Sequence, residues 1–265
     1  YLKEQRYHAA MLFGASTIFE PFGFTGAITD YAIHVDLLNF TNPHTTTLRS
    51  RPVKPGDIGV LQRIQSSNAS DISCSILRER AHFTNQWERF KNATVFTDSQ
   101  GKIEGYMSLR GGMAKLHVEE AEASSDAAFR DLVRFAFRAA GDRMMTGLVY
   151  HGVPNHAFIR ELRSEVPAEA IHQQSGTEGL VQITDIEETI ESMIPEWESR
   201  VNRSLLRELD CEVTLLIDNR PFRVRGHFGA IDIASHDGRN KFSIDAATFT
   251  KLLTGYLDIR GNLGS

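Results

Sequence analysis

The order in which helix-like and strand-like segments follow one another constrains the fold of this chain more than any single motif. The clearest helix spans residues 125–140, where apolar side chains recur every three or four positions and form one stripe. Strand-like segments lie on both sides of it, at 114–118 and 147–150. Strands that alternate with helices are typical of an α/β domain. We therefore expect a sheet-centred domain in the middle of the chain.

Further segments extend this central domain in both directions. The predicted helices are 58–66, 71–91 and 156–165, and the predicted strands are 93–97 and 102–109. Residues 98–101 form the turn of a hairpin between these two strands. Asp57 is the expected N-cap of the first helix. Residues 39–55 are polar and rich in turn-forming residues, so we interpret them as a linker.

The first 40 residues have the pattern of the end of a larger fold. They predict the last turns of a helix, a buried strand at 9–13, a short helix at 15–22 that ends at Gly23, and a strand at 28–38. A piece of this length cannot bury a core of its own. Since the sequence begins with Tyr1 rather than methionine, we expect this piece to pack on preceding chain or on the central domain.

The last part of the chain consists of one long helix followed by a group of strands. The helix covers residues 184–209, with a break expected at Pro195, and a second helix at 246–255 ends at Gly255. The predicted strands are 211–217, 221–227, 230–234 and 242–245. This order indicates an α+β domain, so the fold class predicted for the whole chain is α/β and α+β. The predicted domains are 1–40, 41–180 and 181–265.

Composition and charge exclude several classes of function. The 265 residues include 29 basic and 34 acidic ones, and no Lys/Arg cluster stands out, which argues against nucleic acid as a partner. No apolar run approaches the roughly 18 residues that cross a bilayer. Cys74 and Cys211 match no zinc or redox spacing and are expected to be buried, reduced thiols in a cytoplasmic protein. His151 and His156 lack a third ligand nearby, so no metal site is predicted.

Several stretches carry a resemblance to a known family. Residues 13–24 resemble the last motif of GNAT acetyltransferases, a short helix of the form Tyr-x-x-x-Gly-Phe after a splayed strand. The other stretches are 71–90 with Arg78 and Trp87, 101–106, 119–137 with 153–155, and 180–262. Taken in this order, they resemble Eis-like (enhanced intracellular survival) proteins of the GNAT superfamily over essentially the whole chain.

The resemblance implies a three-part protein. Residues 1–40 would be the remnant of a catalytic GNAT domain, 41–180 a degenerate second GNAT-like domain, and 181–265 a sterol-carrier-protein-like domain. It further implies acetyl-CoA as co-substrate, an amine-bearing small molecule or a lysine side chain as acetyl acceptor, and assembly into a homo-oligomer, commonly a hexamer. The expected function is amine N-acetylation. The alternative is a non-catalytic scaffold, or a module that binds a lipid or another apolar ligand through its last domain.

The resemblance also assigns residues to the site. The catalytic tyrosine of the family, which gives a proton to the departing CoA thiolate, falls at Phe19, whose ring has no proton to give. Ser16, Phe19 and Phe22 are the candidates for contact with the thiol end of CoA, and the alternative is that Phe19 and Phe22 are core aromatics. The glycine-containing pyrophosphate loop would precede Tyr1. Its counterpart at 119–127 has no glycine and four acids, which predicts a structural role for the central domain.

Overall fold

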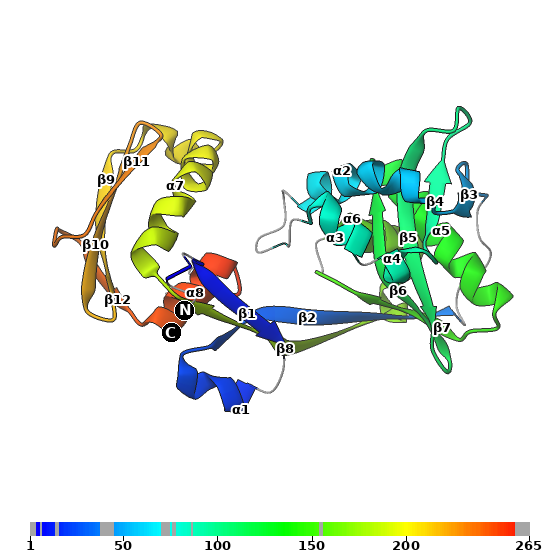
Figure 1. The fold of residues 1–265 in the computed structure, drawn as a ribbon, viewed down its shortest axis with the longest axis horizontal. Coiled ribbons are helices and arrows are strands. Elements are labelled where there is room, and N and C mark those ends of the chain that lie inside the picture. The colour runs from blue at the N-terminus through cyan, green and yellow to red at the C-terminus, as the bar shows by residue number, and fades with distance from the viewer. Residues whose placement is uncertain are drawn as a thin grey trace. The chain divides into compact units, whose positions relative to one another are not determined.

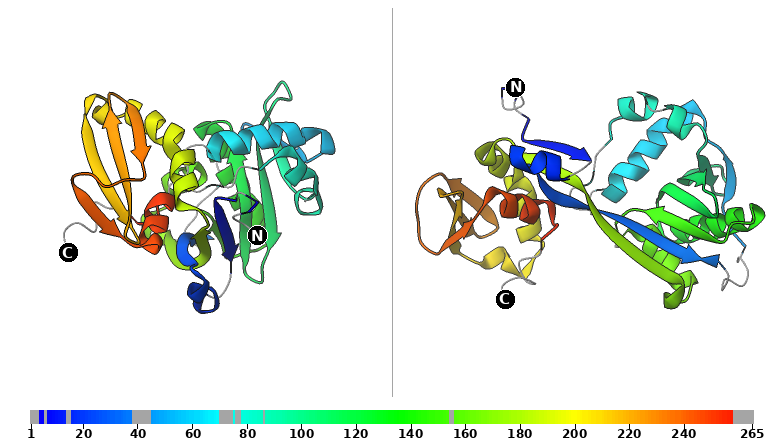
Figure 2. Two further views of the ribbon diagram at one scale, coloured as in Figure 1. Left: turned by 60° about the vertical axis from the view of Figure 1, so that its left-hand side comes forward. Right: turned by 90° about the horizontal axis from the view of Figure 1, so that it is seen from below.

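The computed structural model describes residues 4–5, 7–13, 16–37, 45–69, 75, 78–85, 87–153 and 156–257. The chain divides into two compact units, which Figure 1 shows and which are described separately. Unit 1 comprises Tyr1–Thr29 and Thr177–Ser265, and unit 2 comprises Asp30–Gly176. Strands β2 (Thr25–Asp36) and β8 (Ile171–Ile183) each run from one unit into the other and lie side by side (Figure 2). The division into three domains stays a prediction.

Unit 2 is built around a mixed sheet in the order β8-β2-β7-β6-β5-β4-β3. Its remaining strands are β3 (Arg49–Pro52), β4 (Thr94–Thr97), β5 (Ile103–Gly111), β6 (Lys115–Ala123) and β7 (Gly147–His151). Neighbours from β3 to β6 are antiparallel, β6 and β7 are parallel, and β7 and β2 are antiparallel. The predicted hairpin β4–β5 and the predicted strands β6 and β7 are confirmed.

Helices cover both faces of this sheet. The long helix α5 (Asp126–Asp142) links β6 to β7, and α6 (Ala157–Glu165) packs beside it. Their apolar side chains share a core with Phe96 and Met107. The adjacent residues Val95 and Tyr106 belong to a second core, because successive residues of a strand face opposite sides. That second core packs against α2 (Ile58–Ala69), α3 (Arg80–Asn85) and α4 (Trp87–Phe90).

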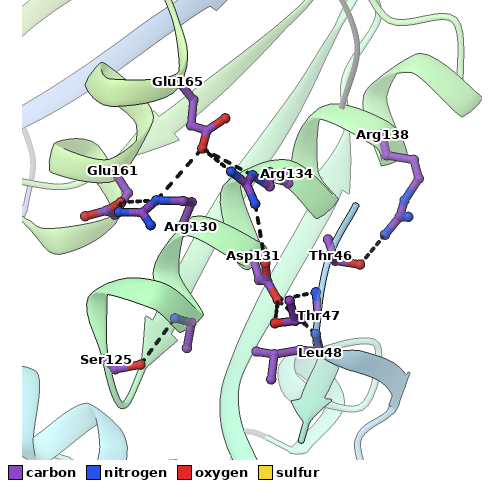
Figure 3. Close-up of polar contacts among 11 residues, drawn as sticks. Thr46, Thr47, Leu48, Ser125, Arg130, Asp131, Arg134, Arg138, Glu161 and Glu165 are labelled. Atoms are coloured by element: carbon purple, nitrogen blue, oxygen red, sulfur yellow. Dashed lines mark hydrogen bonds and ion pairs between the residues drawn. The ribbon is translucent and has the colours of Figure 1, made fainter. Parts of the chain in front are cut away.

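A buried polar network fixes α5 to α6 and to the segment before β3 (Figure 3). The Oδ2 atom of Asp131 accepts hydrogen bonds from the Thr47 N–H at 2.7 Å, the Thr47 hydroxyl at 2.7 Å and the Leu48 N–H at 2.8 Å. One turn further along α5, Arg134 lies 4.0 Å from Asp131, and its guanidinium donates to Glu165 at 2.9 Å. Asp131 is 3% exposed, so the network supplies the partners that a buried carboxylate requires.

Unit 1 contains a small sheet in the order β11-β10-β9-β12, on which the helices α7 and α8 pack. Its strands are β9 (Cys211–Ile217), β10 (Arg220–His227), β11 (Ala230–Ala234) and β12 (Lys241–Ile244). Helices α7 (Ile186–Asn202) and α8 (Ala246–Thr254) contribute Ile190 and Phe249 to the core that they share with Ile217 and Phe222. These four strands and α8 were predicted, and Gly255 ends α8 in the left-handed conformation, at φ +76°.

From β1 onward the beginning of unit 1 follows the predicted order of elements, whereas the helix turns predicted before β1 lie mostly outside the described residues. Strand β1 (Ala9–Phe13) pairs antiparallel with β8. It was predicted to be buried, but Met11 and Phe13 are 43% and 63% exposed, so the prediction of burial is wrong. The short helix α1 (Ser16–Phe19) continues into a 3₁₀ turn that ends at Gly23, whose φ of +86° requires the freedom of glycine. The strand predicted at 28–38 is β2, although residue 38 lies outside the described part of the chain.

Three local predictions are wrong. The expected linker 39–55 contains strand β3, and the predicted helix 71–91 is replaced, in its described part, by the short helices α3 and α4. Asp57 is not the N-cap of α2. It ends a 3₁₀ turn, and its carboxylate accepts from the Lys54 N–H at 2.8 Å and from Arg51 at 2.7 Å, so it holds that turn.

Two further corrections concern unit 1. Helix α7 continues through Pro195, which is exposed. Proline has no N–H to donate to the carbonyl oxygen of Glu191, four residues earlier, but that carbonyl is on the solvent side and can bind water. Cys211 is an exposed free thiol rather than a buried one, and Cys74 lies outside the described residues.

Candidate functional site

The parallel strands β6 and β7 pair along only part of β6, because β7 ends first. Their pairing ends with Val118 opposite Tyr150. Beyond this point β6 continues to Ala123 along β5, after a bulge next to Ser108. Strand β7 ends at His151. Beyond the end of β7 the last residues of β6 have no strand on this side, and we call this place the opening between β6 and β7 and take it as the first candidate site.

Glu120 fills one side of the opening. Its carboxylate accepts from the Tyr106 hydroxyl at 2.5 Å and from Arg78 Nη1 at 2.7 Å to each oxygen. Burial, and then the charge of Glu120, raise the pKa of the Tyr106 phenol well above its usual value, so the hydroxyl keeps its proton and donates. Burial alone would lower the pKa of Arg78, but the Glu120 charge raises it. The three groups form a closed, internally neutralised network.

His156 and Glu122 fill the other side. Glu122 Oε2 accepts from Asn68 Nδ2 at 2.7 Å and lies 3.5 Å from His156 Nε2. His156 Nδ1 accepts the Phe158 N–H at 3.2 Å and so caps α6, which assigns the ring proton to Nε2. The ring of Tyr150 stacks on His156, with 5.7 Å between centroids. Both nitrogens of this buried histidine therefore have partners within the protein.

The N-terminus of α5 borders a cavity of about 370 Å³ beside this cluster. Ser125 is the N-cap of α5 and accepts the Ala128 N–H at 3.2 Å. Asp126, the first residue of the helix, pairs with Arg160 of α6 at 2.6 Å. A helix N-terminus favours an anion. Here the protein supplies that anion with its own Asp126 carboxylate.

Residues 119–127, interpreted as the counterpart of the pyrophosphate loop, are mostly strand and helix rather than loop. Residues 119–123 belong to β6, and α5 begins at Asp126, so the connection is short. Each of the four acids has a donor or a cation beside it: Glu119 has Arg110 at 2.5 Å, Glu120 has Arg78, Glu122 has Asn68, and Asp126 has Arg160. The donors and cations that could bind an anion here are thus already occupied by these four carboxylates, and no unpaired negative charge is needed to explain why an anion would not bind.

Sequence reasoning missed the network around Glu120, although a signal was present. Glu120 and Glu122 alternate with Ala121 and Ala123 in a strand, so both carboxylates project from one face of the sheet. Two acids on one face of an interior strand require buried donors. Arg78 carried part of the family resemblance, but its partner could not be identified from the sequence.

The three residues assigned by resemblance lie in and next to α1 in unit 1. Ser16 begins α1 and Phe19 ends it. The half-buried ring of Phe19 packs edge-on against Phe24, with 6.1 Å between centroids. Phe22 is 69% exposed, so the alternative that it is a core aromatic is wrong. Phe19 and Phe22 thus place aromatic rings close to the surface of unit 1.

The histidines that suggested a metal take other roles. His151 stacks on His117, with 5.7 Å between centroids, and His156 caps α6. Within the described residues, no group of three or more His, Cys, Asp or Glu side chains could hold a metal ion. None of the helices in the described ranges is both long and apolar enough to cross a membrane.

His117 makes the stability of unit 2 sensitive to pH. Burial, and then the charges of Arg110 and His151, lower the pKa of the His117 imidazole, while Glu119 opposes them. The unfolded chain therefore binds this proton more readily than the folded chain does. The contribution of His117 to the stability of unit 2 is fully present above the ordinary histidine pKa, about 6.5. It is lost as the pH falls from there through the lower pKa that His117 has in the folded state.

We expect the His117→Gln variant to lose less stability on acidification than the unchanged protein. Glutamine cannot take up the proton, so this contribution to the pH dependence disappears. Melting temperatures of both proteins at pH 7.5 and pH 5.5 measure the difference. An equal decline in the two proteins would contradict the assignment.

Sequence comparisons find no match, whereas comparisons with solved structures find similar folds. No family model matches the chain, and no curated protein sequence matches it. Among solved structures, a conserved protein of unknown function from Enterococcus faecalis, described as a "probable N-acyltransferase", matches 97% of this chain at 14% identity with a TM-score of 0.73. A GCN5-related N-acetyltransferase from Anabaena variabilis matches 98% at 13% identity, also with a TM-score of 0.73.

A third similar structure is Eis1 from Mycobacterium abscessus, which matches 96% of the chain at 13% identity with a TM-score of 0.60. The chain spans 65%, 66% and 64% of the lengths of these three structures. At such identities the likeness establishes the fold: a mixed α/β chain that resembles GNAT N-acetyltransferases over nearly its whole length.

Proposed function

We propose that this chain is part of an Eis-like, acetyl-CoA-dependent amine N-acetyltransferase in which unit 2 has a structural role. The fold likeness supports the first half of this proposal. The structural role of unit 2 is supported by the opening between β6 and β7. Glu120 and His156 are held there by internal partners, so their side chains occupy the place in which the thioester of acetyl-CoA would bind. The pairing of Asp126 with Arg160 supports it further.

The acetylation chemistry then belongs to a site that includes α1. In acetyl transfer, the amine nitrogen attacks the thioester carbonyl carbon, the carbon–sulfur bond breaks, and the CoA thiolate takes up a proton. We assign Ser16, Phe19 and Phe22 to the thiol end of acetyl-CoA, where the two rings offer an apolar surface. Phe19 cannot supply the proton, so a donor elsewhere in the protein must do so.

The acceptor and the assembly follow from the same proposal. The acceptor is an amine-bearing small molecule or a lysine side chain, and the protein acts as a homo-oligomer, a hexamer by family resemblance. The competing function is a non-catalytic scaffold. A thiol-release assay with acetyl-CoA and an amine separates the two, since a scaffold releases no CoA.

The role of Asp126 is tested by removing its charge. We expect unit 2 of the unchanged chain to show no affinity for inorganic pyrophosphate, and the Asp126→Ser variant to bind it with a dissociation constant of about 1 mM, because Arg160 and the N-terminus of α5 become available. Calorimetry measures both. Asp142→Ser, at the opposite end of α5, is the matched control and should show no affinity. Tight binding of acetyl-CoA by the unchanged unit 2 would refute its structural role.

The catalytic assignment of α1 predicts a gain of function. In a form of the protein that acetylates an amine, Phe19→Tyr should raise kcat about tenfold or more, with little change in the KM for acetyl-CoA, because a hydroxyl at the thiol acts on charge that develops in the transition state. Steady-state kinetics and the melting temperature are measured on the same variant. An unchanged kcat together with a lower melting temperature would show that Phe19 serves only to pack on Phe24.

A further inference from the structure

Unit 2 contains a second cavity, of about 550 Å³, that the proposed function does not use. Helix α2 forms one wall of it, and the beginning of β5 and the end of β6 form another (Figure 1). Its volume is within the range of about 300–1,000 Å³ that small-molecule sites have. We call it the α2 cavity, and its lining includes Arg51, Asp57, Val60, Arg63, Ile64 and Ile103.

Part of the lining of the α2 cavity is apolar. Val60 and Ile64 come from α2, Ile103 begins β5, and Ala123 ends β6. Ile64 and Ala123 are buried, whereas Val60 and Ile103 are only half-buried, so water reaches the apolar wall. A ligand with an apolar body would remove this surface from water, which favours its binding.

Most charged groups at the α2 cavity are already paired. Arg51 donates to the Asp57 carboxylate from two nitrogens, at 2.7 Å and 2.9 Å. Lys102 pairs with Glu104 at 2.5 Å, and Glu104 also accepts a hydrogen bond from Ser124. A cation entering the cavity would have to displace these donors, so the cavity does not select a cation.

Two further acids contact the lining, and both have donors. Asp98, in the turn before β5, accepts the backbone N–H groups of Gln100 and Lys102, each at 2.9 Å. Glu122 accepts from Asn68 at 2.7 Å. Charged side chains that line the cavity or contact its lining are equal in number for the two signs: Arg51, Lys54, Arg63 and Lys102 against Asp57, Asp98, Glu104 and Glu122. The cavity therefore has no net charge, and a ligand with several negative charges, such as a pyrophosphate, would be repelled by its acids.

Arg63 is the charged group of the lining that lacks an ionic partner. Its Nε donates to the Gly59 carbonyl one turn earlier on α2, at 3.2 Å. No carboxylate among the described residues pairs with its guanidinium, and both Nη groups remain available. A guanidinium with two free nitrogens matches the geometry of a single carboxylate. The cavity thus places one site for a carboxylate beside an apolar wall.

We propose that the α2 cavity binds a small molecule that has one carboxylate and an apolar body. The carboxylate accepts hydrogen bonds from the Nη groups of Arg63, and the body covers Val60, Ile64 and Ile103. All residues of this site belong to unit 2, so it is separate from the acetyl transfer assigned to α1. Unit 2 would then serve as a binding module in addition to its structural role.

The test uses the 265-residue chain and two probes of similar shape, naphthoate and the neutral naphthylmethanol. We expect naphthoate to bind with a dissociation constant of about 0.1 mM, and naphthylmethanol about tenfold more weakly. Calorimetry measures both. Arg63→Gln should weaken the binding of naphthoate about tenfold and leave that of naphthylmethanol unchanged, because only the contact with the charge is lost.

Arg143→Gln is the matched control, since Arg143 is an exposed arginine at the end of α5 in the same unit and pairs with no carboxylate of the described residues. It should bind both probes as the unchanged chain does. Val60→Trp places a large ring in the cavity and should abolish the binding of both probes, and melting temperatures establish that each variant is folded. The proposal is overturned if naphthoate does not bind, if the two probes bind equally well, or if Arg63→Gln binds naphthoate as the unchanged chain does. It is also overturned if Arg143→Gln loses as much affinity, or if folded Val60→Trp still binds.

Discussion

Replacing Asp131 by alanine is expected to lower the free energy of unfolding by about 2–3 kcal/mol. The carboxylate is 3% exposed and accepts three hydrogen bonds from Thr47 and Leu48, which attach the segment before β3 to α5. Hydrogen bonds to a buried charge contribute more than neutral ones. The loss is limited because Thr47 is exposed, so water can reach its freed donors. Urea denaturation followed by circular dichroism measures the change.

Asp142→Ala, on the same helix but exposed, is the matched control and should change the free energy of unfolding by less than about 0.5 kcal/mol. A double-mutant cycle with Thr47→Val tests the specific contact, since the two changes should not be additive. Destabilisation of less than about 1 kcal/mol by Asp131→Ala would show that the segment 45–48 is held by other contacts.

The elements that could be predicted from the sequence are those whose local signals agree with their tertiary surroundings. Helix α5 was predicted from its apolar stripe, and the side chains of that stripe pack in the core. The Asp218-Asn219 turn and the glycines that end α1 and α8 are equally clear, because few other residues tolerate a left-handed backbone.

The elements that were missed have local sequences that do not match their surroundings. Strand β3 is polar and ends at Pro52, a composition that a loop shares with an edge strand. The 13-residue strand β8 contains Ser175 and Gly176 and has no clear alternation. Its length depends on its neighbours β1 and β2. Pro195 was given too much weight, since a helix can tolerate proline where the freed carbonyl reaches water.

The chemistry of the candidate site was harder to predict than the fold. The absence of glycine before α5 was visible in the sequence. The ion pairs that hold Glu120 and Asp126 in place were not. Glu120 and Arg78 are 42 residues apart, and their contact requires β6 and the segment before α3 to meet. The pairing of Asp126 with Arg160 depends in the same way on how α5 and α6 pack. Residue types can suggest such pairs, but only the fold determines which residues form them.

The Glu120→Gln variant should cause the larger loss of stability, about 3 kcal/mol in the free energy of unfolding. Removing one partner of a buried ion pair leaves the other charge without compensation, and here the Tyr106 hydroxyl also loses a charged acceptor at 2.5 Å. The Arg78 side chain is 22% exposed, which places the expected loss at the lower end of the range for buried pairs. Chemical denaturation gives the value directly.

The adjacent acid provides the control for this prediction. Glu119 pairs with Arg110, whose side chain is 57% exposed, so Glu119→Gln should change the free energy of unfolding by less than about 1 kcal/mol. The two variants remove the same charge at neighbouring positions of β6 and differ only in burial and partners. If Glu120 fills the opening as proposed, its variant should also admit more water between β6 and β7. Hydrogen exchange at Tyr150 should then be faster in Glu120→Gln than in Glu119→Gln. Equal exchange in both variants, with equal stability, would mean that the opening is closed by packing alone, and the role proposed for Glu120 in unit 2 would be wrong.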